Sequence, residues 1–224
     1  NVAVGYQGGR EITTGVQNVL LGANAGDSLT SGSYNIAIGR NALQAEDAHG
    51  RNVAIGHAAL EDQNAGTDAY NIAIGYQAGK DVTTGTANVI IGGLAGDALT
   101  TSEHNVAIGY AALTNEDEDG RNVAVGYETL NQQNAGTDAY NVAVGYQVGR
   151  EITTGTENTI VGGLAGDAIT IGNQNVAIGT YSLGANVAAD RNVAVGHSAL
   201  SNMTSATTSD TYNVAVGFYA GQAI

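Results

Sequence analysis

The residues with the clearest potential for chemistry form an acidic loop, Asn115-Glu116-Asp117-Glu118-Asp119-Gly120. Oxygen-bearing side chains followed by a glycine at the sixth place match the start of a calcium-binding loop. The bidentate acid expected at the twelfth place is absent, because Gly126 lies there, and the corresponding loops at 44–50 and 184–190 do not keep the acids. We therefore interpret 115–120 as a solvated acidic loop, and we predict no metal site and no cofactor.

The remaining candidates give no stronger signal for catalysis. Segment 92–97 is similar to a calcium-binding nonapeptide, but its acid comes one residue too early and the pattern does not recur on adjacent repeats. The four histidines lie in different repeats, and none is paired with a Ser or Cys nucleophile: His49, His57, His104 and His197. We predict no catalytic residues, and we do not expect an enzyme.

These residues are set in a frame of thirteen five-residue motifs, of which Asn1-Val2-Ala3-Val4-Gly5 is the first. Position one is always Asn, position five always Gly, position two β-branched, and position four Val, Ile or Leu. The motifs start 17 residues apart, except for gaps of 19 residues after Asn52 and Asn122 and of 21 after Asn192. A short fixed period is typical of a solenoid, in which each unit buries its apolar side against its neighbours.

A second period of 70 residues groups the motifs in fours. It divides the chain into blocks 1–70, 71–140 and 141–212 and a partial block 213–224, within one predicted repeat domain, 1–224. Matching residues 70 apart, such as Arg51, Arg121 and Arg191, support the division. The gene was built by copying a block of four units, on this interpretation.

Each unit is predicted to be one coil of an all-β, parallel β-roll solenoid with about 13 coils. The aliphatic side chains at positions two and four share one face of the strand and are expected to form a thin core. A short return strand or extended segment then leads through a glycine turn to the next Asn. The position-one residues are expected to stack as a hydrogen-bonded ladder: Asn1, Asn18, Asn35, Asn52, Asn71, Asn88, Asn105, Asn122, Asn141, Asn158, Asn175, Asn192 and Asn213.

Position three is apolar in every motif, although it alternates with the expected core residues. A strand that is apolar on both faces is buried on both, so we predict that another copy of the chain covers this second face in a rotationally symmetric oligomer. The predicted inter-chain interface is Ala3, Leu20, Ala37, Ala54, Ala73, Ile90, Ala107, Ala124, Ala143, Ile160, Ala177, Ala194 and Ala215.

Aromatic residues lie directly before or after many motifs. Six follow the motif's Gly, and four precede its Asn: Tyr6, Tyr76, Tyr110, Tyr127, Tyr146 and Phe218, then Tyr34, Tyr70, Tyr140 and Tyr212. Aromatic rings at such corners can grip sugars or a receptor. We favour the interpretation that they stack on each other or cap the thin core, and the ligand-binding residues stay unassigned.

Composition excludes several classes of partner. The formal net charge is −14, with only seven Lys and Arg, which argues against nucleic acid and against an anionic membrane surface. No apolar run approaches the ~20 residues of a membrane span, so we expect no membrane insertion of this segment. The absence of Cys excludes disulfides and thiolate metal sites. The chain has neither signal peptide nor initiator Met, which suggests a fragment of something longer.

The motif Asn-Val-Ala-Ile-Gly, at 52–56 and 105–109, resembles the head repeat of YadA-like trimeric autotransporter adhesins. It is also similar to repeats in bacteriophage tail-fibre and spike proteins, which share the Gly-Tyr-Gln-Ala-Gly segment found at 75–79. The resemblance implies a left-handed roll, a homotrimer and an extracellular location, on a cell surface or a virion. The longer unit and the 70-residue block depart from the adhesin pattern and leave adhesin or phage fibre open.

The leading hypothesis is therefore a structural and adhesive segment of a trimeric fibre that contacts a host-surface receptor, a glycan or a matrix protein. The alternative is a purely structural extracellular filament whose rolls stack end to end through open terminal coils, since neither end shows an obvious polar cap. An ice- or carbohydrate-surface binder is less favoured, because no row of threonines runs through consecutive units.

Overall fold

A computed structural model of the chain describes residues 1–116, 120–205, 207 and 209–222. The described residues are all-β and contain no helix. They fall into two compact units, Asn1–Tyr110 and Ala111–Ile224. In both units every motif forms a three-residue strand, and strands pair in parallel with the corresponding strand of the next coil. The predicted all-β parallel solenoid with a 17-residue repeat is confirmed.

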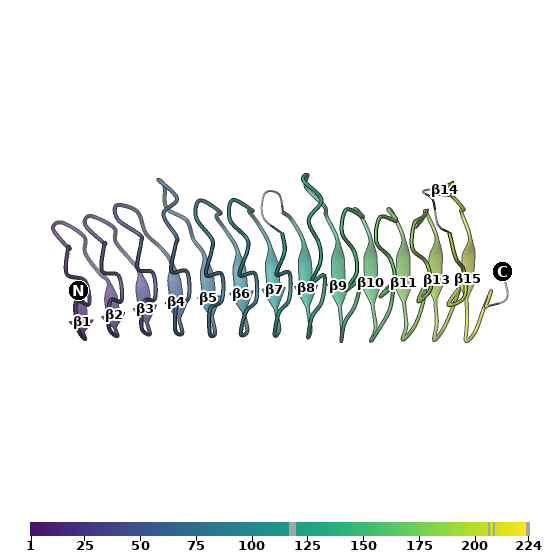
Figure 1. Cartoon of the computed structure of the whole chain (residues 1–224), viewed down its shortest axis with the longest axis horizontal. Coiled ribbons are helices and arrows are strands. Elements are labelled where there is room, and N and C mark those ends of the chain that lie inside the picture. Colours follow the sequence, from purple (N-terminus) through teal and green to yellow (C-terminus); the bar gives the residue numbers. More distant parts are fainter. Residues whose placement is uncertain (117–119, 206, 208, 223–224) are drawn as a thin grey trace. The chain divides into compact units, whose positions relative to one another are not determined.

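The first unit contains seven strands, which lie side by side in chain order (Figure 1). Each motif position pairs with the same position of the next coil, so that Val2 is opposite Val19 and Ala3 is opposite Leu20. The strands are β1 (Val2–Val4), β2 (Val19–Leu21), β3 (Ile36–Ile38), β4 (Val53–Ile55), β5 (Ile72–Ile74), β6 (Val89–Ile91) and β7 (Val106–Ile108).

The second unit repeats this arrangement with the same register, as in the pairing of Ile160 with Ala143 and with Ala177. The loops that follow β4 and β8 extend beyond those of the neighbouring coils within their units (Figure 1), because these coils are two residues longer. The motif strands are β8 (Val123–Val125), β9 (Val142–Val144), β10 (Thr159–Val161), β11 (Val176–Ile178), β13 (Val193–Val195) and β15 (Val214–Val216).

The return half of the coil is mostly built from turns. Among the described residues it forms strands only at β12 (Ala189–Asp190) and β14 (Ser209–Asp210), which pair with each other. Elsewhere backbone bonds still join the coils: the N–H of Thr83 donates to the carbonyl of Thr100 at 2.8 Å. The predicted return strand is thus correct for two coils, and in the others a hydrogen-bonded turn replaces it.

Left-handed residues make the corners of each coil. Counting from the motif's Asn, positions seven, nine and 17 have positive φ, as in Gln77 (53°), Gly79 (59°) and Ala87 (56°). Only glycine adopts this conformation without cost. Many of these corners nevertheless carry other residues, because hydrogen bonds to the neighbouring coils hold them there, such as Gln77 N–H to the carbonyl of His57 at 2.9 Å.

The predicted Asn ladder is present, and its members from Asn18 to Asn192 are buried. The backbone N–H of Asn88 donates to Oδ1 of Asn71 at 2.8 Å, and its own Nδ2 donates to the carbonyl of Ser102 at 2.8 Å. In the second unit the amides also bond to each other directly, with Nδ2 of Asn158 donating to Oδ1 of Asn141 at 3.1 Å. An Asn such as Asn88 therefore ties its strand both to the preceding coil and to its own return segment, whereas Nδ2 of Asn52 donates to Glu46 of the preceding coil.

The predicted direction of the two strand faces is wrong. Position three points into the roll, where its side chain is fully buried from Leu20 to Ala194, while positions two and four point outward. The position-three residues predicted as an inter-chain interface therefore face the interior of the roll, and all but Ala3 are buried there: Ala3, Leu20, Ala37, Ala54, Ala73, Ile90, Ala107, Ala124, Ala143, Ile160, Ala177, Ala194 and Ala215. Ala3 is exposed because it lies in the first coil.

The narrow interior explains the residue sizes at position three. A Cβ added at Gly79 would lie 2.8 Å from Cδ1 of Ile90, and one added at Gly96 would lie 3.3 Å from its Cγ2. The large Ile90 thus fills space that glycine at position nine leaves empty. Where position nine is instead leucine, as at Leu43 and Leu60, position three is alanine. No coil combines a large residue at position three with leucine at position nine.

We expect Ile90→Ala to lower the free energy of unfolding by about 2–5 kcal/mol, because the buried cavity is lined by glycine and cannot collapse. Val16→Ala, at a side chain that is 51% exposed, is the control and should change it by less than about 0.5 kcal/mol. Urea unfolding followed by circular dichroism measures both. Equal stability of the two variants would contradict the inward placement of Ile90.

Candidate self-association face and cation cluster

The outward side chains of positions two and four form two aliphatic rows on each unit, here called the aliphatic face. Apart from Thr159, every member is Val, Ile or Leu. In the first unit it comprises Val2, Val4, Val19, Leu21, Ile36, Ile38, Val53, Ile55, Ile72, Ile74, Val89, Ile91, Val106 and Ile108. In the second unit it comprises Val123, Val125, Val142, Val144, Thr159, Val161, Val176, Ile178, Val193, Val195, Val214 and Val216.

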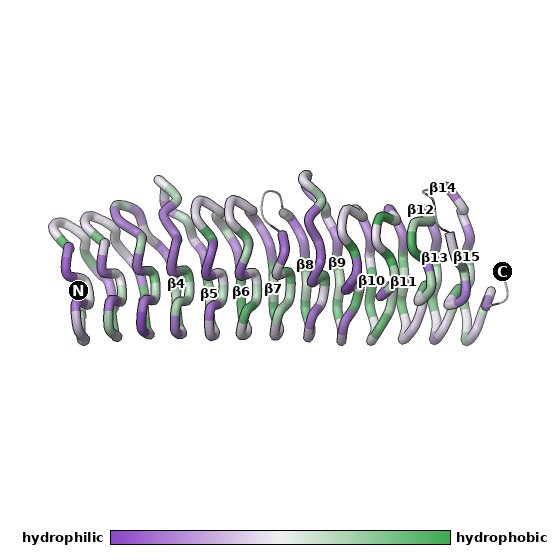
Figure 2. Tube along the Cα trace, in the orientation of Figure 1, coloured by the Kyte–Doolittle hydropathy of each residue, from purple (hydrophilic) through white to green (hydrophobic). Residues whose placement is uncertain are grey.

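The aliphatic face is partly exposed along its whole length. Ile74 retains 36% of its accessible surface and Val142 retains 37%. Apolar stretches recur at corresponding places from coil to coil within each unit (Figure 2). With a strand spacing of ~4.8 Å, the seven strands of the first unit give an apolar strip about 29 Å long. A continuous strip of this kind marks an interaction surface.

One edge of the aliphatic face carries tyrosine and arginine at the last position of several coils, directly before the next motif's Asn. In the first unit the guanidinium of Arg51 lies between the rings of Tyr34 and Tyr70, 5.2 and 5.5 Å from their centres. Its Nε donates to Oδ2 of Asp68 at 2.6 Å. The second unit repeats the arrangement, with Arg121 bonded to Asp138. Arg and Tyr thus cover each other along this edge.

The opposite edge carries aromatic residues at position six, directly after the glycine. His57 stacks on Tyr76 with ring centres 5.4 Å apart, and Tyr127 stacks on Tyr146 at the same distance. Stacking of these aromatic residues on each other or capping of the core was the favoured interpretation, and the pair of Tyr127 with Tyr146 confirms stacking for these two. The rings lie outside the roll, since Tyr76 is 57% and Tyr146 is 54% exposed, so they do not cap its core.

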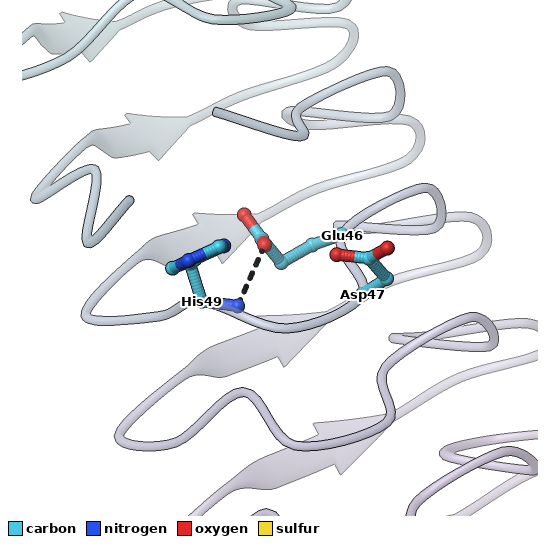
Figure 3. A group of neighbouring side chains, drawn as sticks. All are labelled: Glu46, Asp47 and His49. Atoms are coloured by element: carbon cyan, nitrogen blue, oxygen red, sulfur yellow. Dashed lines mark hydrogen bonds between the residues drawn. The ribbon is translucent and has the colours of Figure 1, made fainter. Parts of the chain in front are cut away.

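A separate group of side chains with the atoms to bind a metal ion lies in the loop of the third coil. Glu46, Asp47 and His49 each offer one ligand atom, and these atoms lie within 4.8 Å of one another (Figure 3). Glu46 is buried, His49 half-buried and Asp47 exposed. Burial is the main cause that raises the pKa of Glu46 to about 7, and the nearby carboxylates of Asp47 and Asp68 raise it further. The His49 N–H donates to Oε1 of Glu46 at 3.2 Å and partly offsets this rise.

The sequence interpretation missed this group, because it compared only the number of acids in the corresponding loops. The histidine three residues after Glu46 was the available signal. The acidic loop first considered, 115–120, lies partly outside the described residues. In the 92–97 segment the structure places Asp97 half-buried, and burial raises its pKa. The described residues do not bring the four histidines together in one site: His49, His57, His104 and His197.

The described residues enclose no pocket. They also form no helix, and therefore none that could cross a membrane. Comparisons with protein-family models, with curated proteins and with solved structures found no match.

Proposed function

We propose that this chain is a structural and adhesive segment of a trimeric surface or virion fibre, in which three copies bury their aliphatic faces against one another. The observation that carries the proposal is the outward double row at positions two and four. Burying an aliphatic side chain contributes up to ~1.5–3 kcal/mol, and the gain repeats at every coil. The choice of three copies rests on the resemblance of the motif to trimeric adhesins, because an apolar strip is equally suited to the interface of a dimer.

The other surfaces suit a fibre in an aqueous setting. Net charge of −14 opposes non-specific adhesion and aggregation. The loops that follow β4 and β8 carry Gly66 and Gly136 at φ 69° and 64°, and a Cβ added at either would have no described atom within 4 Å. We assign contacts with a host receptor, a glycan or a matrix protein to such projecting loops and to the exposed aromatic edges, at an extracellular location.

Sedimentation equilibrium tests the trimer. We expect the wild-type chain to sediment as a trimer, and we expect Ile74→Asp to dissociate it while leaving the strand signal in circular dichroism, because Ile74 points outward. Packing three copies would place three carboxylates in one apolar interface, where unpaired charge is strongly unfavourable.

The control is Thr84→Asp, which adds the same charge to an exposed position on the return side of the same coil. It should remain trimeric. A monomeric wild type, or an Ile74→Asp chain that is as trimeric as its parent, would refute burial of the aliphatic face between copies. A stable dimer would retain the face but overturn the threefold arrangement.

A further inference from the structure

The loop of the third coil places Glu46, Asp47 and His49 together, although the Asn ladder needs only one hydrogen-bond acceptor from this loop. Oε2 of Glu46 accepts a hydrogen bond from Nδ2 of Asn52 at 3.4 Å. In the next coil Gln63 has the same role, with its Oε1 accepting from Nδ2 of Asn71 at 2.6 Å. A neutral amide therefore suffices to close the ladder, and makes a shorter bond. In the second unit the carboxylate of Glu116 closes the ladder in the same way, by accepting from Nδ2 of Asn122 at 3.2 Å. It is therefore His49, beside Glu46 and Asp47, that calls for another explanation.

No positively charged side chain of the described residues is among the groups that act most strongly on the carboxylate of Glu46. Its carboxylate is fully buried, and the charged neighbours that act on it are the carboxylates of Asp47 and Asp68. Its hydrogen bonds with the N–H of His49 and with Nδ2 of Asn52 are long, at 3.2 and 3.4 Å, and the backbone of Asp47 only partly offsets the effect of burial. Nδ1 of His49 is likewise buried and has no hydrogen-bond partner. A buried carboxylate without a cation and a buried imidazole nitrogen without a partner both gain from one bound dication.

The loop backbone is held in place by the preceding coil. The carbonyl of Asp47 accepts from the N–H of Thr30 at 2.6 Å and from its hydroxyl at 2.9 Å. Within the same coil, the carbonyl of His49 accepts from Nδ2 of Asn35 at 3.4 Å. The three side chains thus project from a fixed backbone, which reduces the entropy lost when a ligand orders them. Tetrahedral zinc needs ligand atoms about 3.4 Å apart, so binding would draw these atoms closer together than their present spacing of up to 4.8 Å.

We propose that Glu46, Asp47 and His49 bind one transition-metal dication of the zinc type. One imidazole and two carboxylates favour such an ion over calcium or magnesium, which take oxygen ligands and more of them. Three protein ligands leave one position of a tetrahedral ion to water or to a group from a binding partner. The sequence shows no histidine in the corresponding loops 114–120 and 184–190, so the site occurs once per chain.

Isothermal titration of the untagged, metal-free chain with zinc chloride tests the proposal. We expect saturation at one zinc per chain. His49→Ala and Glu46→Gln should each weaken binding at least tenfold, and zinc should raise the melting temperature of the wild type but not of these variants. Glu46→Gln is expected to fold, because glutamine occupies the same place in the next coil.

His104→Ala is the matched control, since His104 lies beside a single acid, Glu103, at 3.8 Å and is exposed. It should bind zinc within twofold of the wild type. Three outcomes would overturn the proposal: no saturable binding, unchanged affinity in His49→Ala, or calcium binding as tightly as zinc at the same place.

Discussion

Replacing Gly92 by alanine is expected to lower the free energy of unfolding by about 2–6 kcal/mol or to prevent folding. Gly92 has φ +133°, which an L side chain rarely adopts. Its new Cβ would also lie 2.6 Å from the carbonyl carbon of Gly109 in the next coil, against the backbone itself. Because the N–H of Gly109 donates to the carbonyl of Ile91 at 2.7 Å, the backbone of Gly109 cannot move aside without breaking a bond between coils.

The adjacent Gly93 supplies the control. A Cβ added there would meet its nearest described atom, Cδ2 of Tyr110, at 3.6 Å, an ordinary contact. We expect Gly93→Ala to change stability by less than about 1 kcal/mol. The pair recurs in the second unit as Gly162, 2.7 Å from the carbonyl carbon of Gly179, and the open Gly163. Thermal unfolding of the four variants decides the matter, and equal losses within a pair would show that backbone approach does not require the glycine.

Asn158→Ala is expected to cost about 2–5 kcal/mol. The side chain of Asn158 is fully buried. Its Nδ2 donates to the carbonyl of Gly172 at 2.9 Å, and its Oδ1 accepts the backbone N–H of Asn175 at 2.9 Å. Alanine removes both partners and leaves a buried carbonyl and a buried N–H without bonds, each at about 1–3 kcal/mol.

Asn134→Ala is the control for the ladder, because Asn134 is exposed in the longer loop of the same unit. It should change the unfolding midpoint in urea by little. Asn158→Asp separates the two roles: it keeps an acceptor for Asn175 but loses the donor to Gly172 and buries a charge. We expect it to be at least as unstable as the alanine variant. An aspartate variant as stable as the wild type would mean that the donated bond contributes nothing.

The period, the parallel pairing and the ladder could be predicted from the sequence, because they follow from repetition. When identical motifs recur at 17 residues, each Asn pairs with the next in register, as Asn18 N–H does with Oδ1 of Asn1. The strict glycine at position five has the same origin, since every coil brings the next backbone to the same point. Local spacing alone carries this information.

The approach of the three ligand atoms of Glu46, Asp47 and His49 could not be predicted from the sequence. Their approach depends on the turn that follows Glu46 and on the preceding coil, whose Thr30 holds the Asp47 carbonyl. The corresponding loop in the second block has more acids, and it was therefore the first metal-site candidate in the sequence. Counting acids was misleading, because Glu116 is as fully buried as Glu46. What distinguishes the first loop is His49, whose buried Nδ1 has no hydrogen-bond partner among the described residues.

By itself the sequence determined that positions one and three share one strand face and that positions two and four share the other, since side chains alternate along a strand. Only the tertiary structure decided which face is inside. Both faces are apolar, so alternation could not distinguish them. The return segment comes so close to the strand that Ala73 fits inside, and Ile90 fits only opposite glycine. The bulkier rows, such as Ile72 and Ile74, are therefore left on the outside, where a partner can cover them.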